Sequence, residues 1–167
     1  MEFPESMGPF FVSREKRDLF LRGDLWKTWH REYPEIFDAD DLRLAQGQAS
    51  LGYHFYEWFA AIQLFEGLGY LSLVEKYQFK RHKRKYEVFS ERIQSSTETL
   101  DLIKRRRDFG NVQLPDLFVY RKEDLSDWFF CEIKGAGDRM RSSQEKFFRQ
   151  LSQSCRRPVV SIQVNLK

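Results

Sequence analysis

The stretches LPDLFVY (residues 114–120) and WFFCEIK (residues 128–134) decide the fold of this sequence. Each is a short run of apolar, β-branched and aromatic residues of the kind that forms strands, and the polar segment KEDLSD between them predicts a turn. Two strands joined by a short turn pair as an antiparallel hairpin, so the start of the first strand lies beside the end of the second. The hairpin is therefore expected to bring Asp116 and Glu132 together.

Downstream of the hairpin, the sequence predicts one helix and one strand. The helix covers SSQEKFFRQLSQS (residues 142–154), with Ser142 as its N-cap and Glu145 completing a capping box. Beyond Pro158, VVSIQVNL (residues 159–166) predicts the last strand of the sheet.

Upstream, the sequence predicts a helix followed by a strand. YHFYEWFAAIQLFE (residues 53–66) is expected to form a helix that ends at Gly67 and Gly69, and a strand is expected over residues 71–79. The order helix, strand, insertion, strand, strand, helix, strand predicts an α/β domain over residues 51–167. Its small central mixed sheet is flanked by helices.

Residues 1–50 predict an N-terminal helical extension. Short apolar and charged pieces alternate over residues 11–48, which indicates two or three short helices broken at Gly23 and Pro34. The aromatic residues of this extension either cover the sheet, which is the arrangement that we expect, or form the interface of a homodimer. They include Phe20, Trp26, Trp29 and Phe37.

Composition limits the class of protein. Of the 167 residues, 41% are hydrophobic and 16% are aromatic, which is enough for a buried core and excludes a fully disordered chain. The charged fraction of 32%, without a long uncharged apolar run, excludes a membrane-spanning protein. The first residues lack a basic start followed by an apolar run, so we expect no signal peptide and a soluble, cytoplasmic protein. The cysteines and histidines lack zinc-site spacing, so a bound metal needs oxygen ligands.

Three acidic residues occupy positions where an ionised carboxylate is costly. Asp116 opens an apolar strand, Glu132 lies inside another, and Glu57 shares a helix face with apolar residues. An isolated buried charge is unfavourable by several kcal/mol unless it is paired or bound to a metal. The expected convergence of these carboxylates predicts a site for a hard cation, Mg²⁺ or Mn²⁺. The carbonyl oxygen of Ile133 adds a further ligand if the backbone there faces the metal.

Lys134 and Gln144 complete the set of candidate catalytic residues with Asp116 and Glu132. Lys134 projects from the same strand face as Glu132. There it can orient or deprotonate a water molecule that attacks a phosphate, although a simple ion pair with Glu132 is the alternative. Gln144 lies on the inward face of its helix, where its amide needs a hydrogen-bond partner. It either makes a polar contact in the core or holds Lys134 or the attacking water in place.

Although the net charge of the chain is only +3, one segment is strongly basic. Residues 76–107 contain eleven basic and four acidic residues, with the basic ones concentrated in KRHKRK (residues 80–85) and KRRR (residues 104–107). Such a local excess favours a nucleic-acid partner over a solvated helix face. This basic insertion, at about residues 80–110, is expected to grip the phosphate backbone without reading sequence. Its candidate contact residues are Lys80, Arg81, Lys83, Arg84, Lys85, Lys104, Arg105, Arg106 and Arg107.

The block EIKGAGDRMRSSQEKFFRQL, preceded by LPDLFVY, resembles the VRR-Nuc (virus-type replication-repair nuclease) branch of the PD-(D/E)XK superfamily. The similarity lies in the PD strand, the E-I-K-G strand end, the G-x-D-R-M turn and the glutamine that opens the helix. It covers residues 112–165 well and residues 52–80 loosely. It implies a restriction-endonuclease-like core with the element order αβββαβ.

The resemblance also implies roles for individual residues. Asp116 and Glu132 would be metal ligands, Lys134 the catalytic lysine, Gln144 the supporting glutamine and Glu57 the helix glutamate that completes the cation site. Asp138 and Arg139 would shape the turn after the catalytic strand, and Arg139 would contact phosphate.

Through the same resemblance we expect a Mg²⁺- or Mn²⁺-dependent DNA endonuclease that hydrolyses flapped or branched DNA in repair or recombination. The family includes the Fanconi-associated nuclease and short stand-alone domains that resolve branched DNA as dimers, and this chain is more like the stand-alone kind. It departs from the family by its N-terminal extension and its basic insertion. The alternatives are a restriction or defence nuclease that acts on duplex DNA, and a non-cutting DNA-binding module that kept the fold.

Overall fold

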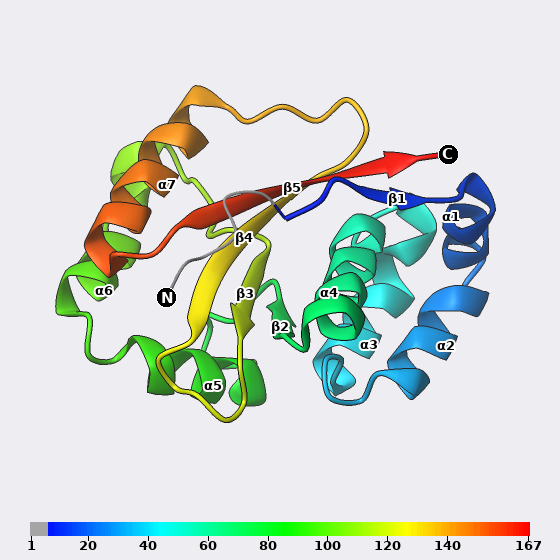
Figure 1. The fold of residues 1–167 in the computed structure, drawn as a ribbon, viewed down its shortest axis with the longest axis horizontal. Coiled ribbons are helices and arrows are strands. Elements are labelled where there is room, and N and C mark those ends of the chain that lie inside the picture. Colours follow the sequence, from blue (N-terminus) through cyan, green and yellow to red (C-terminus); the bar gives the residue numbers. More distant parts are fainter. Residues whose placement is uncertain (1–6) are drawn as a thin grey trace.

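A computed structural model describes residues 7–167 and shows an α/β protein built on one mixed, curled sheet (Figure 1). Five strands lie in the order β1-β5-β4-β3-β2. The strands are β1 (Phe10–Val12), β2 (Leu71–Val74), β3 (Leu117–Tyr120), β4 (Trp128–Lys134) and β5 (Val159–Leu166). The helices are α1 (Arg14–Leu21), α2 (Asp24–Glu32), α3 (Ala39–Gln48), α4 (Phe55–Leu68), α5 (Lys83–Ile93), α6 (Thr97–Lys104) and α7 (Ser142–Cys155). Two short 3-10 helices complete the fold, η1 (Ala49–Leu51) and η2 (Arg106–Phe109).

The hairpin predicted from the sequence is confirmed. β3 and β4 pair antiparallel, with Leu117 opposite Cys131 and Tyr120 opposite Trp128. After β4, α7 returns the chain so that β5 pairs parallel to β4. The predicted order of elements from α4 to β5 is correct, and so is the α/β class with a mixed sheet flanked by helices.

The N-terminal segment contributes a strand as well as helices. Three helices are separated at Gly23 and Pro34, as expected, but β1 precedes them and pairs parallel to β5, with Phe10 opposite Val164. The sequence did not predict this strand. It has only three residues, all of them apolar, so no alternating pattern of apolar and polar residues marks it.

Aromatic side chains attach the N-terminal helices to α4. The ring of Phe20 lies 5.3 Å from that of Phe55 and 6.0 Å from that of Trp58, and Trp29 stacks on Phe55 at 6.1 Å. All four side chains are buried. Each buried side chain of this size contributes about 1.5–3 kcal/mol to folding. These aromatics therefore pack inside the chain, against the helix that carries Glu57.

β2 is shorter than the strand expected over residues 71–79. It ends at Val74, because Glu75 and Lys76 have positive φ angles of 49° and 57°. Left-handed backbone is uncommon in residues other than glycine and is incompatible with a strand. The chain thus turns away from the sheet immediately after β2.

The start of α7 also differs from the expectation. The helix begins at Ser142, so its N-cap residue is Arg141, and the Arg141 N–H donates to Oε1 of Gln144 at 3.1 Å. The expected capping box of Ser142 and Glu145 is therefore wrong. Gln144 accepts the N-cap hydrogen bond in place of Glu145.

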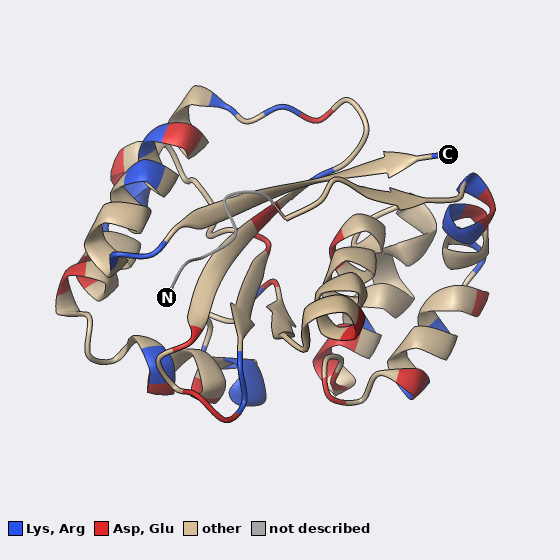
Figure 2. Cartoon of the chain, viewed as in Figure 1, with Lys and Arg blue, Asp and Glu red and all other residues tan. Residues whose placement is uncertain are grey.

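The basic insertion is helical and forms α5, α6 and η2. Figure 2 shows Lys and Arg on α5, on α7 and on the loop between β4 and α7. Among residues 7–167, no helix has both the length and the apolar character that crossing a lipid bilayer requires.

Candidate metal centre

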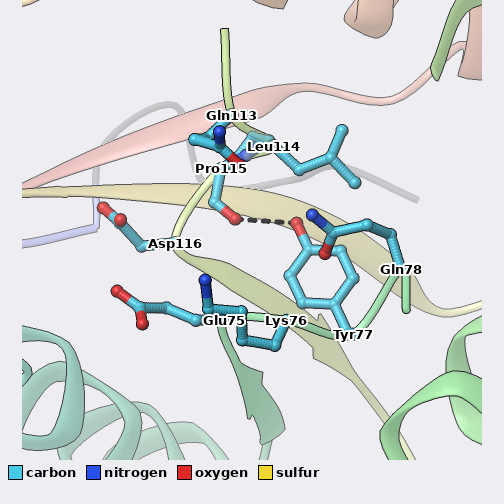
Figure 3. A pocket seen from close by; sticks show the side chains of 8 residues that line it. All are labelled: Glu75, Lys76, Tyr77, Gln78, Gln113, Leu114, Pro115 and Asp116. Carbon is cyan, nitrogen blue, oxygen red and sulfur yellow. Dashed lines mark hydrogen bonds between the residues drawn. The ribbon is translucent and has the colours of Figure 1, made fainter. Parts of the chain in front are cut away.

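Three carboxylates from separate elements meet where α4 approaches the sheet. Glu57 lies in the first turn of α4, Glu75 directly follows β2, and Asp116 directly precedes β3. One carboxylate oxygen of each residue lies within 4.8 Å of those of the other two. Figure 3 shows the side chains of Glu75 and Asp116 side by side at the edge of a small cavity. We call these three residues the acidic triad.

Strand pairing places two members of the acidic triad next to each other. β2 and β3 are antiparallel, and beyond their paired residues the Glu75 N–H donates to the Asp116 carbonyl oxygen at 2.8 Å. The buried Tyr77 fixes the same turn, because its hydroxyl donates to the Pro115 carbonyl oxygen at 2.7 Å (Figure 3). Backbone contacts therefore hold these two carboxylates together.

The acidic triad carries more negative charge than its surroundings tolerate. Burial, together with the negative charge of Glu75, raises the pKa of Glu57 to about 7. Burial and the charges of Glu132 and Glu57 raise the pKa of Asp116 well above its ordinary value. Carboxylates this close cannot all ionise without a balancing positive charge. A divalent cation would supply that charge, and a set of carboxylate oxygens fits Mg²⁺ or Mn²⁺.

His54 keeps Glu75 ionised. Burial acts to raise the pKa of Glu75, but the hydrogen bond and the charge of His54 lower it below its ordinary value. His54 Nδ1 lies 3.1 Å from Glu75 Oε2, and Nε2 lies 2.6 Å from Oε1 of Gln48. Burial acts to lower the pKa of His54, yet the hydrogen bond and charge of Glu75 raise it. A protonated imidazole donates to both neighbours, so His54 orients one member of the triad.

Glu132 lies beside the acidic triad and is held by two donors. Lys134 Nζ donates to Oε1 of Glu132 at 2.7 Å, and Gln144 Nε2 donates to the same oxygen at 3.3 Å. The Lys134 and Glu132 side chains are 14% and 6% exposed. The ion pair considered as an alternative from the sequence is present. It lies next to the triad, since the charge of Glu132 acts on both Glu57 and Asp116.

The backbone of Ile133 faces Asp116. The Ile133 N–H donates to Oδ2 of Asp116 at 2.8 Å. In a strand, the N–H and C=O groups of one residue point to the same edge. The Ile133 carbonyl oxygen is thus directed to the edge of β4 on which Asp116 lies, as a metal ligand at this position requires.

Gly135 allows α4 to approach the end of β4 closely. A Cβ atom at this position would lie 2.6 Å from the ring of Tyr56, the residue before Glu57. The Gly135 N–H donates to Oδ2 of Asp138 at 3.0 Å, so Asp138 shapes the turn as expected. Arg139, in the same turn, is exposed.

Two of the candidate DNA-contact residues pair with aspartates of the N-terminal segment. Lys85 is fully buried, and its Nζ donates to Oδ1 of Asp41 at 2.5 Å and to the Val74 carbonyl oxygen at 2.6 Å. It is therefore unavailable to DNA, which corrects the expectation for this residue. Arg84 is partly exposed and donates to Oδ2 of Asp38 at 2.9 Å.

The other candidate contact residues are on the surface. Arg106 is partly buried and donates to the Ile103 carbonyl oxygen at 3.2 Å. The exposed ones are Lys80, Arg81, Lys83, Lys104, Arg105, Arg107 and Arg139. We call the first six of these the exposed cations of the insertion.

The sequence did not predict two residues of this site, Glu75 and His54. Glu75 seemed to lie inside a longer strand, and its position opposite Asp116 depends on the left-handed turn that ends β2. His54 precedes α4 and itself has a φ angle of +73°. An acidic residue shortly after a strand that pairs with the PD strand is the sequence signal that would have indicated Glu75.

Comparisons of the chain with protein-family models, with curated proteins and with solved structures found no match.

Proposed function

We propose that this protein is a Mg²⁺- or Mn²⁺-dependent DNA endonuclease with a PD-(D/E)XK-type core, which hydrolyses phosphodiester bonds in flapped or branched DNA. One observation carries the proposal. The acidic triad, drawn from α4 and from the ends of β2 and β3, lies beside Glu132 and Lys134 on the adjacent strand. The order of elements from α4 to β5 supports it, because it is the order that the sequence resemblance implies.

The residues of the site are suited to phosphodiester hydrolysis. Glu57, Glu75 and Asp116, with the Ile133 carbonyl oxygen, are the groups that would hold the cation. A divalent cation bound there supplies an activated water and offsets the negative charge that develops on the phosphate. Lys134 donates to Oε1 of Glu132, beside the acidic triad, where we propose that it orients the water or the scissile phosphate. Glu132 holds that side chain in place, and Gln144 in turn donates to Glu132.

Mutation of the site tests the proposal. Purified protein is incubated with labelled flap, four-way junction, duplex and single-stranded DNA, in Mn²⁺, Mg²⁺ or chelator. We expect cleavage of flap or junction only with a metal, and loss of at least about 100-fold in rate for Asp116→Asn or Lys134→Ala. The exposed residues Asp18 and Lys122 provide matched controls, Asp18→Asn and Lys122→Ala, which should cut normally.

The same substrates separate the alternatives. Preferred cutting of plain duplex indicates a restriction or defence nuclease. DNA binding without any cutting in Mn²⁺ indicates a non-cutting module and contradicts the proposal. Cleavage that persists in Asp116→Asn also contradicts it, because the activity then arises elsewhere. The mass of the protein in solution, alone and with junction DNA, shows whether the chain forms a homodimer, the alternative that the sequence leaves open.

A further inference from the structure

An apolar groove of about 430 Å³ lies between α5 and α6 of the basic insertion. Its walls include the rings of Phe79 and Tyr86 and the side chains of Leu100 and Ile103. Phe79, Tyr86 and Leu100 are partly exposed rather than closed inside the core. We call this hollow the insertion groove. Its apolar walls are suited to flat, weakly polar groups.

The charged residues that line the insertion groove are basic, and one of them, Lys104, also lies 3.8 Å from Oδ1 of Asp101. Lys104 and Arg106 line it, and within the described chain it has no acidic lining residue. Arg81 lies over the ring of Phe79, at 5.3 Å from the ring centroid, and the ammonium group of Lys76 lies 6.0 Å from it. A ligand that matches this surface combines negative charge with apolar faces.

Gln78 connects the insertion groove with the acidic triad. Its side chain lines the groove and also the cavity of about 160 Å³ whose walls include Glu75 and Asp116 (Figure 3). Its Oε1 atom is buried and has no hydrogen-bond partner among residues 7–167. A buried acceptor without a partner costs free energy, so this site favours a ligand that brings an N–H donor. The exocyclic amines and ring N–H groups of nucleobases are such donors.

We infer that the insertion groove binds unpaired bases of a DNA single strand whose backbone continues to the acidic triad. Bases present apolar faces that stack on aromatic rings, and their phosphates match the cations of the rim. This inference rests on the proposed function and refines it. It assigns to the nuclease substrates with an unpaired strand next to the cleavage site, as in a flap.

Equilibrium binding of two single strands tests the inference. Fluorescence anisotropy in chelator compares a short labelled thymidine oligonucleotide with an abasic strand of the same length, which keeps the phosphates but lacks the bases. Stacking on the groove predicts that wild-type protein binds the thymidine strand at least about 5-fold more tightly. Binding through the backbone alone predicts equal affinities.

Two variants locate the effect. Tyr86→Ala removes a ring from the groove, so it should weaken binding of the thymidine strand about 5-fold or more and leave the abasic strand unchanged. Lys104→Glu, at an exposed rim residue, should weaken both strands alike. Phe11→Ala is the matched control, because Phe11 is a half-exposed aromatic residue that lies on β1 and does not line the groove. Melting curves confirm that each variant is folded.

The outcomes separate this inference from the proposed function. Equal affinity of wild-type protein for both strands overturns the inference, even if metal-dependent cutting is intact. A preference for the thymidine strand that Phe11→Ala reduces as much as Tyr86→Ala also overturns it. Absence of binding to either strand also overturns the inference, and would indicate that the groove binds a protein instead. A thymidine preference lost in Tyr86→Ala supports the groove, whether or not the protein cuts DNA.

Discussion

The protonation of Glu57 reports on the charge of the acidic triad. Its pKa of about 7 lies above the ordinary 4.5, so the folded protein keeps a proton that the unfolded chain has released. The free energy of unfolding therefore falls as pH rises from the unfolded pKa towards the folded one. In chelator, we expect Glu57→Gln to be more stable than wild type at about pH 8 by on the order of 1–3 kcal/mol, with a much smaller difference at about pH 5.

Urea unfolding at the two pH values measures this difference. Glu35→Gln, at an exposed position, is the matched control and should change stability little at either pH. Mn²⁺ should raise the unfolding midpoint of wild type more than that of Glu57→Gln, because the cation binds the ionised carboxylate. An equal stability difference at both pH values would contradict the raised pKa of Glu57.

The sequence predicted part of this site because strand pairing fixes the relative positions of some of its residues. Asp116 and Glu132 face each other as a consequence of hairpin pairing, and Lys134 follows Glu132 on the same strand. Glu75 was not predictable in this way. It reaches the site through a left-handed turn built from a glutamate and a lysine, and no glycine marks that turn in the sequence.

At the scale of secondary-structure elements, a buried ion pair joins α3, α5 and the end of β2. Lys85 of α5 contacts both Asp41 of α3 and the carbonyl oxygen of Val74. Lys85→Met should lower the free energy of unfolding by about 3–5 kcal/mol, because it leaves Asp41 buried without its partner. Urea denaturation of this variant, compared with Lys83→Ala on the exposed face of the same helix, measures the loss.

A double variant tests whether the loss arises from the unpaired charge. Asp41→Leu combined with Lys85→Met replaces the pair with apolar groups, and should recover much of the stability lost in Lys85→Met alone. A double variant as unstable as the single one would indicate that the hydrogen bond to Val74 is the main contribution of Lys85.

Helices and strands were predictable where the element itself shows a clear pattern of apolar and polar residues. α4, α7 and the β3–β4 hairpin have such patterns and form close to the expected residues. β1 has too few residues for a pattern and depends on β5, which follows it by more than a hundred residues. Lys85 shows that a run of charged residues in the sequence can contain a buried position. It shares the buried face of α5 with Phe89 and Ile93, at helical spacing, and that face was hidden among neighbouring cations.

At the scale of the whole molecule, the proposed function predicts that the exposed cations of the insertion set the dependence of DNA affinity on salt. Each phosphate contact that is lost lowers the slope of log K against log salt concentration by about 0.9 for duplex DNA. Replacing Lys80, Arg81 and Lys83 by glutamine should therefore reduce the slope by up to about 3 and weaken binding to all sequences alike. Titrations at several salt concentrations measure it.

Arg14, Lys16 and Arg22 provide a matched control, because they are exposed cations of the N-terminal helices on the other side of the molecule. Their replacement by glutamine removes the same formal charge. An equal reduction of the slope by both sets would contradict a specific role for the insertion, and indicate general attraction of DNA to a basic protein.

The absence of a side chain at Gly135 has a consequence for the whole molecule. α4 belongs with the N-terminal helices, β4 belongs to the sheet, and the two touch where Tyr56 covers this glycine. A single methyl group in Gly135→Ala would act as a spacer between them. It would widen the gap between α4 and the sheet without removing any functional group, so we expect weaker Mn²⁺ binding from a protein whose charged residues are all intact.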